Sequence, residues 1–230
     1  MKGFLVFCAI MIFWVSCNEP DFQQSTPLIA NSIEPRSLIR EAAGFLRDGD
    51  LVVRLGRDPT SQFIKNFNRL DKNYSHAGIV MFERGQPLIY HMVNGAKGDE
   101  ERLRHDSLPV FCNARSNKAF GIFRYRMSKA ETAYLKKLLS QWYRKGIRFD
   151  YKLDLATDDR MYCSEMVKKA IERATNGRIT LSTTPLSQTE IDKMSRHSSL
   201  ALNSAGTLNM VAIDNLYENQ FCYPVMKYRF

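Results

Sequence analysis

The sequence lacks several features that would assign it to a class of protein at once. Only 5 of its 230 residues are cysteine and 4 are histidine, and no two form a C-x-x-C or H-x-x-x-H pair of the kind that binds structural zinc. It contains no internal repeat and no nucleic-acid-binding motif, although its formal net charge is +9. No apolar run reaches the length of about 20 residues that spans a bilayer. We therefore expect no metal, no cofactor, no nucleic-acid partner and no membrane-spanning helix.

The N-terminal apolar run extends from Phe4 to Val15, after a short basic start, and is followed by Ser16 and Cys17. Its length predicts a signal peptide over residues 1–16. A small residue directly before a cysteine at this place resembles the lipobox of bacterial lipoproteins, in which the cysteine becomes the lipid-modified first residue. We expect a protein of the bacterial cell envelope, anchored to a membrane by a lipid on Cys17, with plain secretion as the alternative.

The rest of the chain divides into a tether and one domain. Residues 17–37 mix proline, glutamine, serine and asparagine without periodicity, which is typical of a tether. Residues 38–230 are long enough for a single domain with a substantial core. In an exported protein the excess of basic residues favours attraction to anionic envelope polymers or lipid headgroups, or it forms a solvated basic surface.

One cysteine stands at the start of a predicted helix. The stretch "RMYCSEMVKKAIERA", residues 160–174, has apolar residues at helical spacing after Cys163, and Asn-Gly follows as a stop signal. The unpaired N–H groups of a helix start favour a thiolate and can receive an oxyanion. From these residues alone Cys163 is a packed small side chain, a disulfide partner, a metal ligand or a nucleophile. Cys112 and Cys222 either pair or remain separate buried thiols.

Two histidines accompany a predicted hairpin upstream. The strand-like runs 77–82 and 88–93 are led by His76 and contain His91, respectively. The linker 83–85 is expected to form a type I turn with its glycine in the left-handed conformation.

The register of this hairpin decides where the two imidazoles lie. If Phe82 pairs with Gln86, His91 falls opposite Ala77, one residue from His76. A slip of one residue moves every side chain to the other face of the sheet. The sequence therefore predicts that the two histidines are neighbours, and it leaves their contact open.

Several further segments have the features of helices and turns that support the domain. Capping boxes are expected at Ser128 to Glu131 and at Ser187 to Glu190, and an apolar helical face follows the first of them. Asp50 reads as a turn residue before a buried strand, or as a residue that lines the site. The segment 178–210 is either a rim over the site or a decoration without a catalytic role.

Six segments of the chain form a further pattern: "RDGDLVVRLG" (47–56), "YSHAGIVM" (74–81), "PLIYHMV" (87–93), "KGIRFDYKL" (145–153), "MYCSEMVKKA" (161–170) and "VAIDNLYENQFCYPV" (211–225). In this order they resemble the permuted papain-like amidases, the YiiX and YaeF-like branch of the NlpC superfamily, which is also akin to lecithin:retinol acyltransferase. The resemblance covers roughly residues 38–227. It implies an α+β, permuted papain-like (NlpC-type) fold, in which an antiparallel sheet or open barrel packs against the helix that carries the cysteine.

The resemblance also implies a role for individual residues. Cys163 is the nucleophile, His76 is its general base, and His91 is the third polar residue, which orients the base. In this branch the third position is commonly glutamate, whereas histidine is typical of other NlpC-type and retinol-acyltransferase relatives. A hydroxyl of Tyr162 or Tyr74 could assist at the oxyanion or the substrate, and ordinary packing is the alternative for both.

Three functions remain open. The first is a cysteine hydrolase that cleaves amide bonds of cell-wall peptides or related envelope substrates through a thioester. The second is a lipid-directed thioesterase or acyltransferase with the same Cys-His-His triad. The third is a binding lipoprotein whose triad is inactive. An apolar acyl groove beside Cys163 would favour the second, and a carboxylate-binding arginine or lysine would favour the first.

Overall fold

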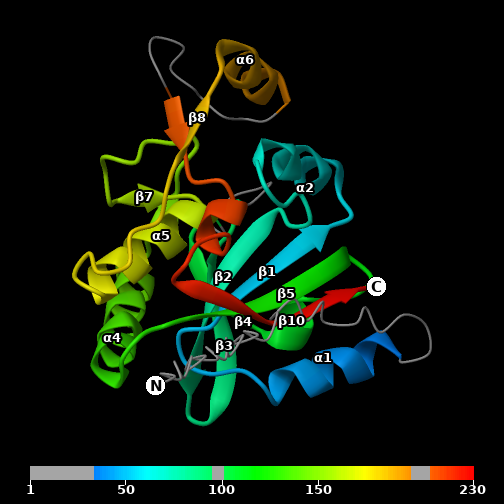
Figure 1. Ribbon diagram of the computed structural model, residues 1–230, viewed down its shortest axis with the longest axis vertical. Coiled ribbons are helices and arrows are strands. Elements are labelled where there is room, and N and C mark those ends of the chain that lie inside the picture. The colour runs from blue at the N-terminus through cyan, green and yellow to red at the C-terminus, as the bar shows by residue number, and fades with distance from the viewer. Residues whose placement is uncertain (1–33, 95–100, 198–207) are drawn as a thin grey trace, which may run out of the picture.

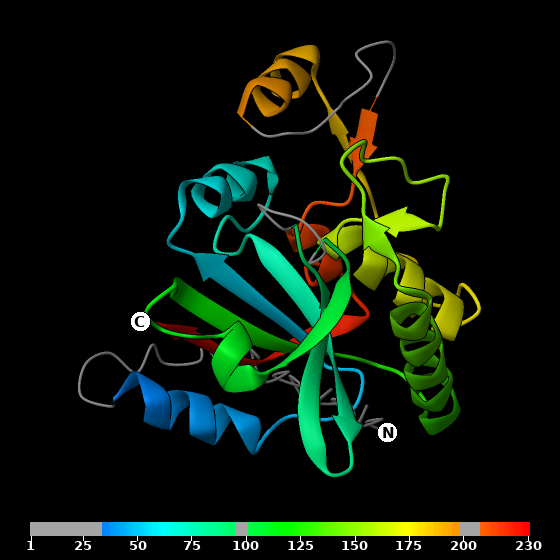
Figure 2. The same cartoon turned by 180° about the vertical axis from the view of Figure 1, so that it is seen from behind.

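A computed structural model describes residues 34–94, 101–197 and 208–230 (Figures 1 and 2). At its centre lies a six-stranded antiparallel sheet with the strand order β10-β5-β1-β2-β3-β4. Its strands are β1 (Leu51–Gly56), β2 (His76–Glu83), β3 (Gln86–Met92), β4 (Leu103–Ser107), β5 (Asn117–Tyr125) and β10 (Cys222–Arg229). The fold is α+β with an antiparallel sheet, as the sequence predicted.

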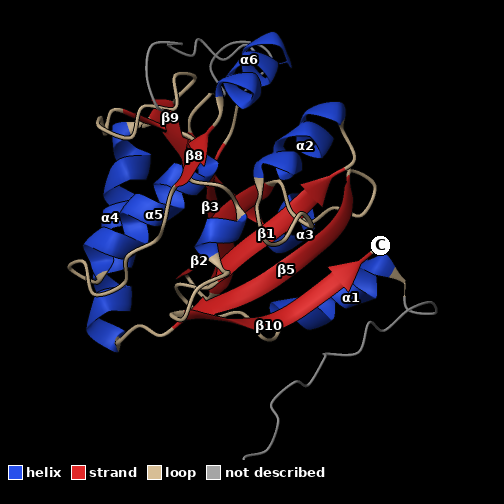
Figure 3. Ribbon diagram, turned by 45° about the horizontal axis from the view of Figure 1, so that its top comes forward, coloured by secondary structure: helices blue, strands red, loops and turns tan. Residues whose placement is uncertain are grey.

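Helices cover both faces of this sheet (Figure 3). Their bounds are α1 (Pro35–Ala43), α2 (Pro59–Ile64), α3 (Leu108–Phe111), α4 (Lys129–Lys145), α5 (Cys163–Ala174) and α6 (Gln188–His197), with 3₁₀ turns η1 (Lys65–Phe67) and η2 (Asp214–Leu216). Two small pairs complete the described elements: β6 (Arg148–Phe149) with β7 (Arg160–Met161), and β8 (Thr184–Leu186) with β9 (Leu208–Met210). None of the described helices is both long and apolar enough to cross a membrane.

Successive side chains of a strand point to opposite faces of the sheet, and each face has its own hydrophobic core. In β1, Leu51 and Val53 face α4 and α5, whereas Val52 between them faces α1 and α3. All three side chains are fully buried. Burial on both faces explains why β1 begins with three consecutive apolar residues.

The predicted capping boxes of α4 and α6 are both confirmed, and so is the predicted end of α4. The Ser128 hydroxyl caps α4 by accepting from the Glu131 backbone N–H, and the Glu131 carboxylate accepts from the Ser128 N–H. The second capping box, at Ser187, is also formed. Helix α4 ends at Gly146 in the left-handed conformation (φ 69°). Asp50 is fully buried and bridges the Arg124 guanidinium, so its role is structural.

The structure adds detail to two segments, the expected tether and residues 178–210. Helix α1 begins at Pro35, within the expected tether, and its first buried side chains are Leu38 and Ile39. In the 178–210 segment, β8 and α6 extend beyond the sheet on the side of α2 (Figure 1), and Glu190 of α6 pairs with Arg69 at 2.7 Å. Residues 198–207 of this segment, the signal peptide and Cys17 lie outside the described residues.

Candidate active site

Cys163 is the first residue of α5 and is half-buried. Tyr162 precedes the helix with an extended backbone, and its N–H donates to the Glu165 carboxylate over 3.1 Å. The Ser164 hydroxyl donates to the Val211 carbonyl (2.6 Å), and the Val211 N–H donates to the Tyr162 hydroxyl (2.8 Å). These contacts fix the positive end of the helix dipole around the Cys163 backbone.

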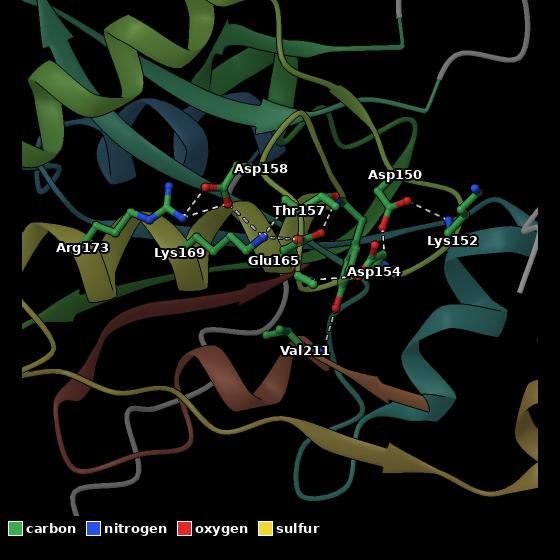
Figure 4. Close-up of polar contacts among 11 residues, drawn as sticks. Asp150, Lys152, Asp154, Thr157, Asp158, Glu165, Lys169, Arg173 and Val211 are labelled. Carbon is green, nitrogen blue, oxygen red and sulfur yellow. Dashed lines mark hydrogen bonds and ion pairs between the residues drawn. The ribbon is translucent and has the colours of Figure 1, made fainter. Parts of the chain in front are cut away.

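A chain of ion pairs runs along the flank of α5 (Figure 4). The side chain of Glu165 is fully buried and lies 2.7 Å from the Lys169 ammonium, which also pairs with Asp158 at 3.1 Å. Arg173 reaches the same Asp158 at 2.7 Å. Burial raises the pKa of Glu165 to about 7, although Lys169 acts against this shift. The loop beneath the helix is organised by Asp150, whose carboxylate accepts from two backbone N–H groups.

The thiol of Cys163 faces the start of β2. Burial is the largest influence on its pKa and raises it above the ordinary value. The backbone N–H groups of Ala77 and Ser164, and then the charge of Arg54, act on the pKa in the opposite direction. The expected preference for a thiolate is thus outweighed by desolvation. The influence of the Ala77 amide places the thiol near the start of β2, whose first residue is His76.

The hairpin of β2 and β3 has a shorter loop than we expected. Residues 84–85 both have positive φ angles, 49° and 80°, as in a two-residue type I′ turn. Glu83 therefore pairs with Gln86, and the expected pairing is wrong by one residue. The same register continued along the hairpin places His91 opposite Gly78, on the face of the sheet that is opposite to the expected one.

This register brings the two histidines together. His76 and Gly78 are two residues apart and share a face of β2, and His91 lies on the same face of β3. His76 Nε2 is 3.0 Å from His91 Nδ1, and the two rings meet edge to face. Phe111 of α3 packs against both rings, with centroid distances of 5.5 and 4.9 Å. A methyl group on Gly78 would lie only 3.1 Å from the His91 Cβ atom, so the missing side chain permits this approach.

A carboxylate that we did not predict extends this pair. His91 Nε2 lies 2.9 Å from Asp106 Oδ2, and Arg104 Nη2 lies 2.8 and 2.9 Å from the two oxygens of the same carboxylate. The hydrogen bond with His91 and then the one with Arg104 lower the pKa of Asp106 to about 2. The carboxylate is therefore ionised at neutral pH and can only accept hydrogen bonds.

Both imidazoles are neutral at neutral pH. Burial, followed by the charge of Arg54 and the neighbouring His91, holds the pKa of His76 well below its ordinary value. Burial also lowers the pKa of His91 and outweighs its hydrogen bond with Asp106. The contact between His91 and Asp106 is consequently a hydrogen bond to a charged acceptor and not an ion pair at this pH.

Arg54 places a positive charge beside these groups. It is paired with His76 across β1 and β2, and its Nη1 donates to the Asn117 side-chain oxygen over 2.8 Å. The guanidinium lies 5.1 Å from the centre of the Phe111 ring. Its Nε atom is buried and has no hydrogen-bond partner among the residues that the structure describes. A guanidinium remains charged even where burial lowers its pKa.

The two candidate tyrosines are both engaged in packing. The Tyr162 hydroxyl accepts from the Val211 N–H, which leaves its own proton available. Tyr74 is buried, with its ring edge-on to Phe123 at 6.2 Å. Its hydroxyl lies over Gly121 of β5, where a methyl group would be 2.7 Å away. These contacts favour the packing role for Tyr74.

The thiols of Cys112, Cys163 and Cys222 are all free. Cys112 is buried and Cys222 is half-buried. The sequence left open whether Cys112 and Cys222 form a disulfide or remain separate thiols, and in the structure they are separate thiols.

Known proteins share both the sequence pattern and the fold of this chain. The family described as "Permuted papain-like amidase enzyme, YaeF/YiiX, C92 family" matches residues 45–211. Among solved structures, the chain is similar to the metalloprotein yiiX from Escherichia coli O157:H7, with 18% identity and a TM-score of 0.63. The match covers 80% of this chain and 98% of that one. The curated proteins gave no match.

Because that relative is called a metalloprotein, the residues of this chain can be tested for a metal site. Within the described ranges, no group of three or more His, Cys, Asp and Glu side chains could hold a metal ion. His91 uses both ring nitrogens in hydrogen bonds, to His76 and to Asp106. The described residues thus do not fit a metal site.

Proposed function

Because this chain belongs to the family of permuted papain-like amidases, YaeF/YiiX, C92 family, we propose that it is a cysteine amidase. Cys163 is the nucleophile, His76 is the general base, and His91 orients that base. The observation that carries the proposal is the 3.0 Å hydrogen bond between the imidazoles of His76 and His91, together with a Cys163 thiol whose pKa is raised by burial and lowered in part by the backbone N–H of Ala77, the residue after His76. A nucleophile, a base and a group that orients the base are the parts this chemistry requires.

The reaction starts from neutral partners, because burial favours the uncharged forms of the thiol and of both imidazoles. His76 takes the thiol proton as the Cys163 sulfur bonds to the acyl carbon and the carbonyl electron pair moves to oxygen. The Cys163 backbone N–H has no partner within α5 and can donate to this oxyanion.

Collapse of this intermediate breaks the C–N bond. The proton on His76 passes to the leaving nitrogen, and a thioester remains on Cys163. Water then attacks the thioester while His76 accepts its proton, and the thiol recovers that proton as the acid product leaves. Each proton that His76 takes is returned, so the cycle closes without another reactant.

The positive charge of Arg54 close to Cys163 favours a substrate that carries a negative charge. The Arg54 charge acts on Cys163 and on both imidazoles, and a guanidinium recognises carboxylates with a planar fork of donors. We propose that the substrate amide carries a carboxylate near the scissile bond, as peptides of the cell wall do. A carboxylate on the substrate favours amide hydrolysis of peptides over the lipid-directed reactions.

The envelope location is also part of the proposal. It depends on the predicted signal peptide and on a lipid at Cys17. The described chain starts beside a cavity of about 780 Å³ that is lined in part by Arg36, Arg40 and Arg115. Cations close to the expected tether support attraction to anionic headgroups or polymers. Labelled palmitate should be incorporated into the expressed protein and should not be incorporated after Cys17→Ser.

The activity test compares short peptide amides that end in a free carboxylate with the same peptides after amidation of that end. We expect hydrolysis of the former, and an acyl adduct on Cys163 visible by mass spectrometry after rapid quenching. Cys163→Ala and His76→Ala should abolish both signals, and Cys222→Ala is the matched control that should retain them. Arg54→Met should raise KM for the carboxylate peptides only.

Other outcomes have distinct meanings. Turnover of acyl esters without any amide hydrolysis would replace the amidase with a thioesterase or acyltransferase. Absence of both an adduct and turnover with amides and esters would overturn the assignment of an enzyme.

A further inference from the structure

The hydrogen-bond chain behind the thiol ends on a strand at the edge of the sheet. His76, His91 and Asp106 lie on the consecutive strands β2, β3 and β4. In the register of β3 and β4, Arg104 is directly opposite His91 and Asp106 is opposite Ile89. Both charged residues therefore share a face with His91, and Asp106 lies diagonally across from it.

Chemistry allows only one direction of donation along this chain. An ionised carboxylate accepts hydrogen bonds and cannot donate them, so His91 must carry its proton on Nε2 to satisfy Asp106. A neutral imidazole has one N–H, which leaves His91 Nδ1 as an acceptor. That atom is 3.0 Å from His76 Nε2, so His76 must carry its proton on Nε2. The Nδ1 atom of His76 is then unprotonated.

We propose that Asp106 is a positioning residue which fixes the tautomers of both histidines, so that Nδ1 of His76 is the atom that accepts the proton of Cys163. The role of Cys163 in this statement rests on the proposed function, whereas the tautomers are a property of the resting protein. Arg104 holds the carboxylate in place through both of its oxygens.

No proton has to move along the chain during the reaction. When Nδ1 of His76 receives the thiol proton, the ring becomes an imidazolium and keeps its Nε2–H bond to His91. The opposite tautomer would present an N–H to the sulfur and could not act as a base. Asp106 thus selects the competent form without touching the substrate.

The structure predicts an unusual effect for Asp106→Asn. Arg104 can only donate hydrogen bonds, so the amide oxygen of the new side chain should turn toward Arg104. Its NH₂ group then faces His91 Nε2, which must become an acceptor. The proton moves to His91 Nδ1, that N–H donates to His76 Nε2, and the His76 proton moves to Nδ1. A single isosteric change should therefore reverse both tautomers.

The direct test is ¹⁵N NMR of the mature protein with labelled histidine at neutral pH. In the wild type, Nε2 of His76 and of His91 should show the shift of a protonated nitrogen, and both Nδ1 atoms that of an unprotonated one. Asp106→Asn should exchange these shifts, while Asp192→Asn, a control on α6, should not. A wild-type His76 with its proton on Nδ1 would overturn the proposal, whether or not the variant folds.

The second test measures reactivity without a known substrate. Alkylation of Cys163 by iodoacetamide should slow by about 10² to 10⁴-fold in Asp106→Asn, the scale of the contribution that a general base makes. Asp106→Ala should be no more damaging than Asp106→Asn, because water can accept from His91, whereas a purely structural role predicts the reverse order. Adding Arg104→Met to Asp106→Asn should partly restore the rate, since the amide can then rotate.

Two failures can be told apart. If His76→Ala leaves alkylation unchanged, the proposed base and hence the proposed function fail. If His76→Ala slows alkylation while Asp106→Asn leaves both the rate and the ¹⁵N shifts unchanged, only the role of Asp106 fails.

Discussion

Replacement of Gly78 by alanine should show how tightly the histidine pair depends on one missing side chain. The new methyl group would lie 2.5 Å from the Ile89 Cγ2 atom, 2.9 Å from the Tyr90 carbonyl oxygen and 3.1 Å from the His91 Cβ atom. The last two atoms are backbone or bonded directly to it, so rotation of a side chain cannot remove these clashes. Strands β2 and β3 must therefore separate locally.

This separation of the strands should lower both the stability of the protein and the reactivity of Cys163. Overpacking of a buried site costs about 1–3 kcal/mol of unfolding free energy. A shift of His91 by about 1 Å would break its 3.0 Å hydrogen bond with His76, and a misplacement of this size costs about 10²-fold in rate. Urea unfolding measures the first effect, and alkylation of Cys163 with ¹⁵N shifts of the histidines measures the second.

Gly121→Ala provides a matched control. A methyl group there would lie 2.7 Å from the Tyr74 hydroxyl and 2.9 Å from a ring atom of Phe123, in the same sheet and away from the histidines. We expect a comparable loss of stability with unchanged histidine shifts. The reasoning is refuted if Gly78→Ala is as stable as the wild type, or if it loses stability while His76 and His91 keep their hydrogen bond.

Three further measurements test the electrostatics. The rate of Cys163 alkylation should rise with an apparent pKa above the ordinary value of about 8.5, because burial raises it; an inflection below that value would contradict the neutral resting state. Glu165 should hold its proton up to about pH 7 when folded and lose it near pH 4.3 when unfolded, so the contribution of Glu165 to wild-type stability against urea, measured relative to Glu165→Gln, should fall as pH rises between these values. An equal slope of stability with pH in both proteins would exclude this contribution. Asp50→Ala should cost about 3–5 kcal/mol, because it leaves Arg124 without its buried partner at 2.7 Å; a loss below about 1 kcal/mol in urea unfolding would contradict this.

The helix at Cys163 and the strands that carry the histidines could be predicted because their signals are local. Apolar periodicity and the Asn-Gly stop define α5, and two apolar runs define β2 and β3. The register could not be predicted, since it depended on whether the turn used two residues or three. The observed loop has a non-glycine residue, Arg84, at positive φ, which sequence preferences rarely favour.

Asp106 was missed for a different reason. Strand β4 reads "LRHDS", and only its first residue is buried, so it lacks the alternation by which strands are found. Its identity as a strand arises from pairing with β3. The raised pKa of the Cys163 thiol was missed for a similar reason, because the depth of burial depends on how the whole domain packs.

The order of the site along the chain also has a consequence for biosynthesis. The strands β2, β3 and β4 are neighbours in sequence and in the sheet, so the proposed base and the carboxylate proposed to support it belong to one local meander. Such short-range pairings close quickly, whereas contacts between distant segments form later. The sulfur arrives with α5, after α4 has been made, and it meets the imidazole only when that helix docks. The newly made polypeptide therefore carries an unactivated thiol until most of the domain has been synthesised.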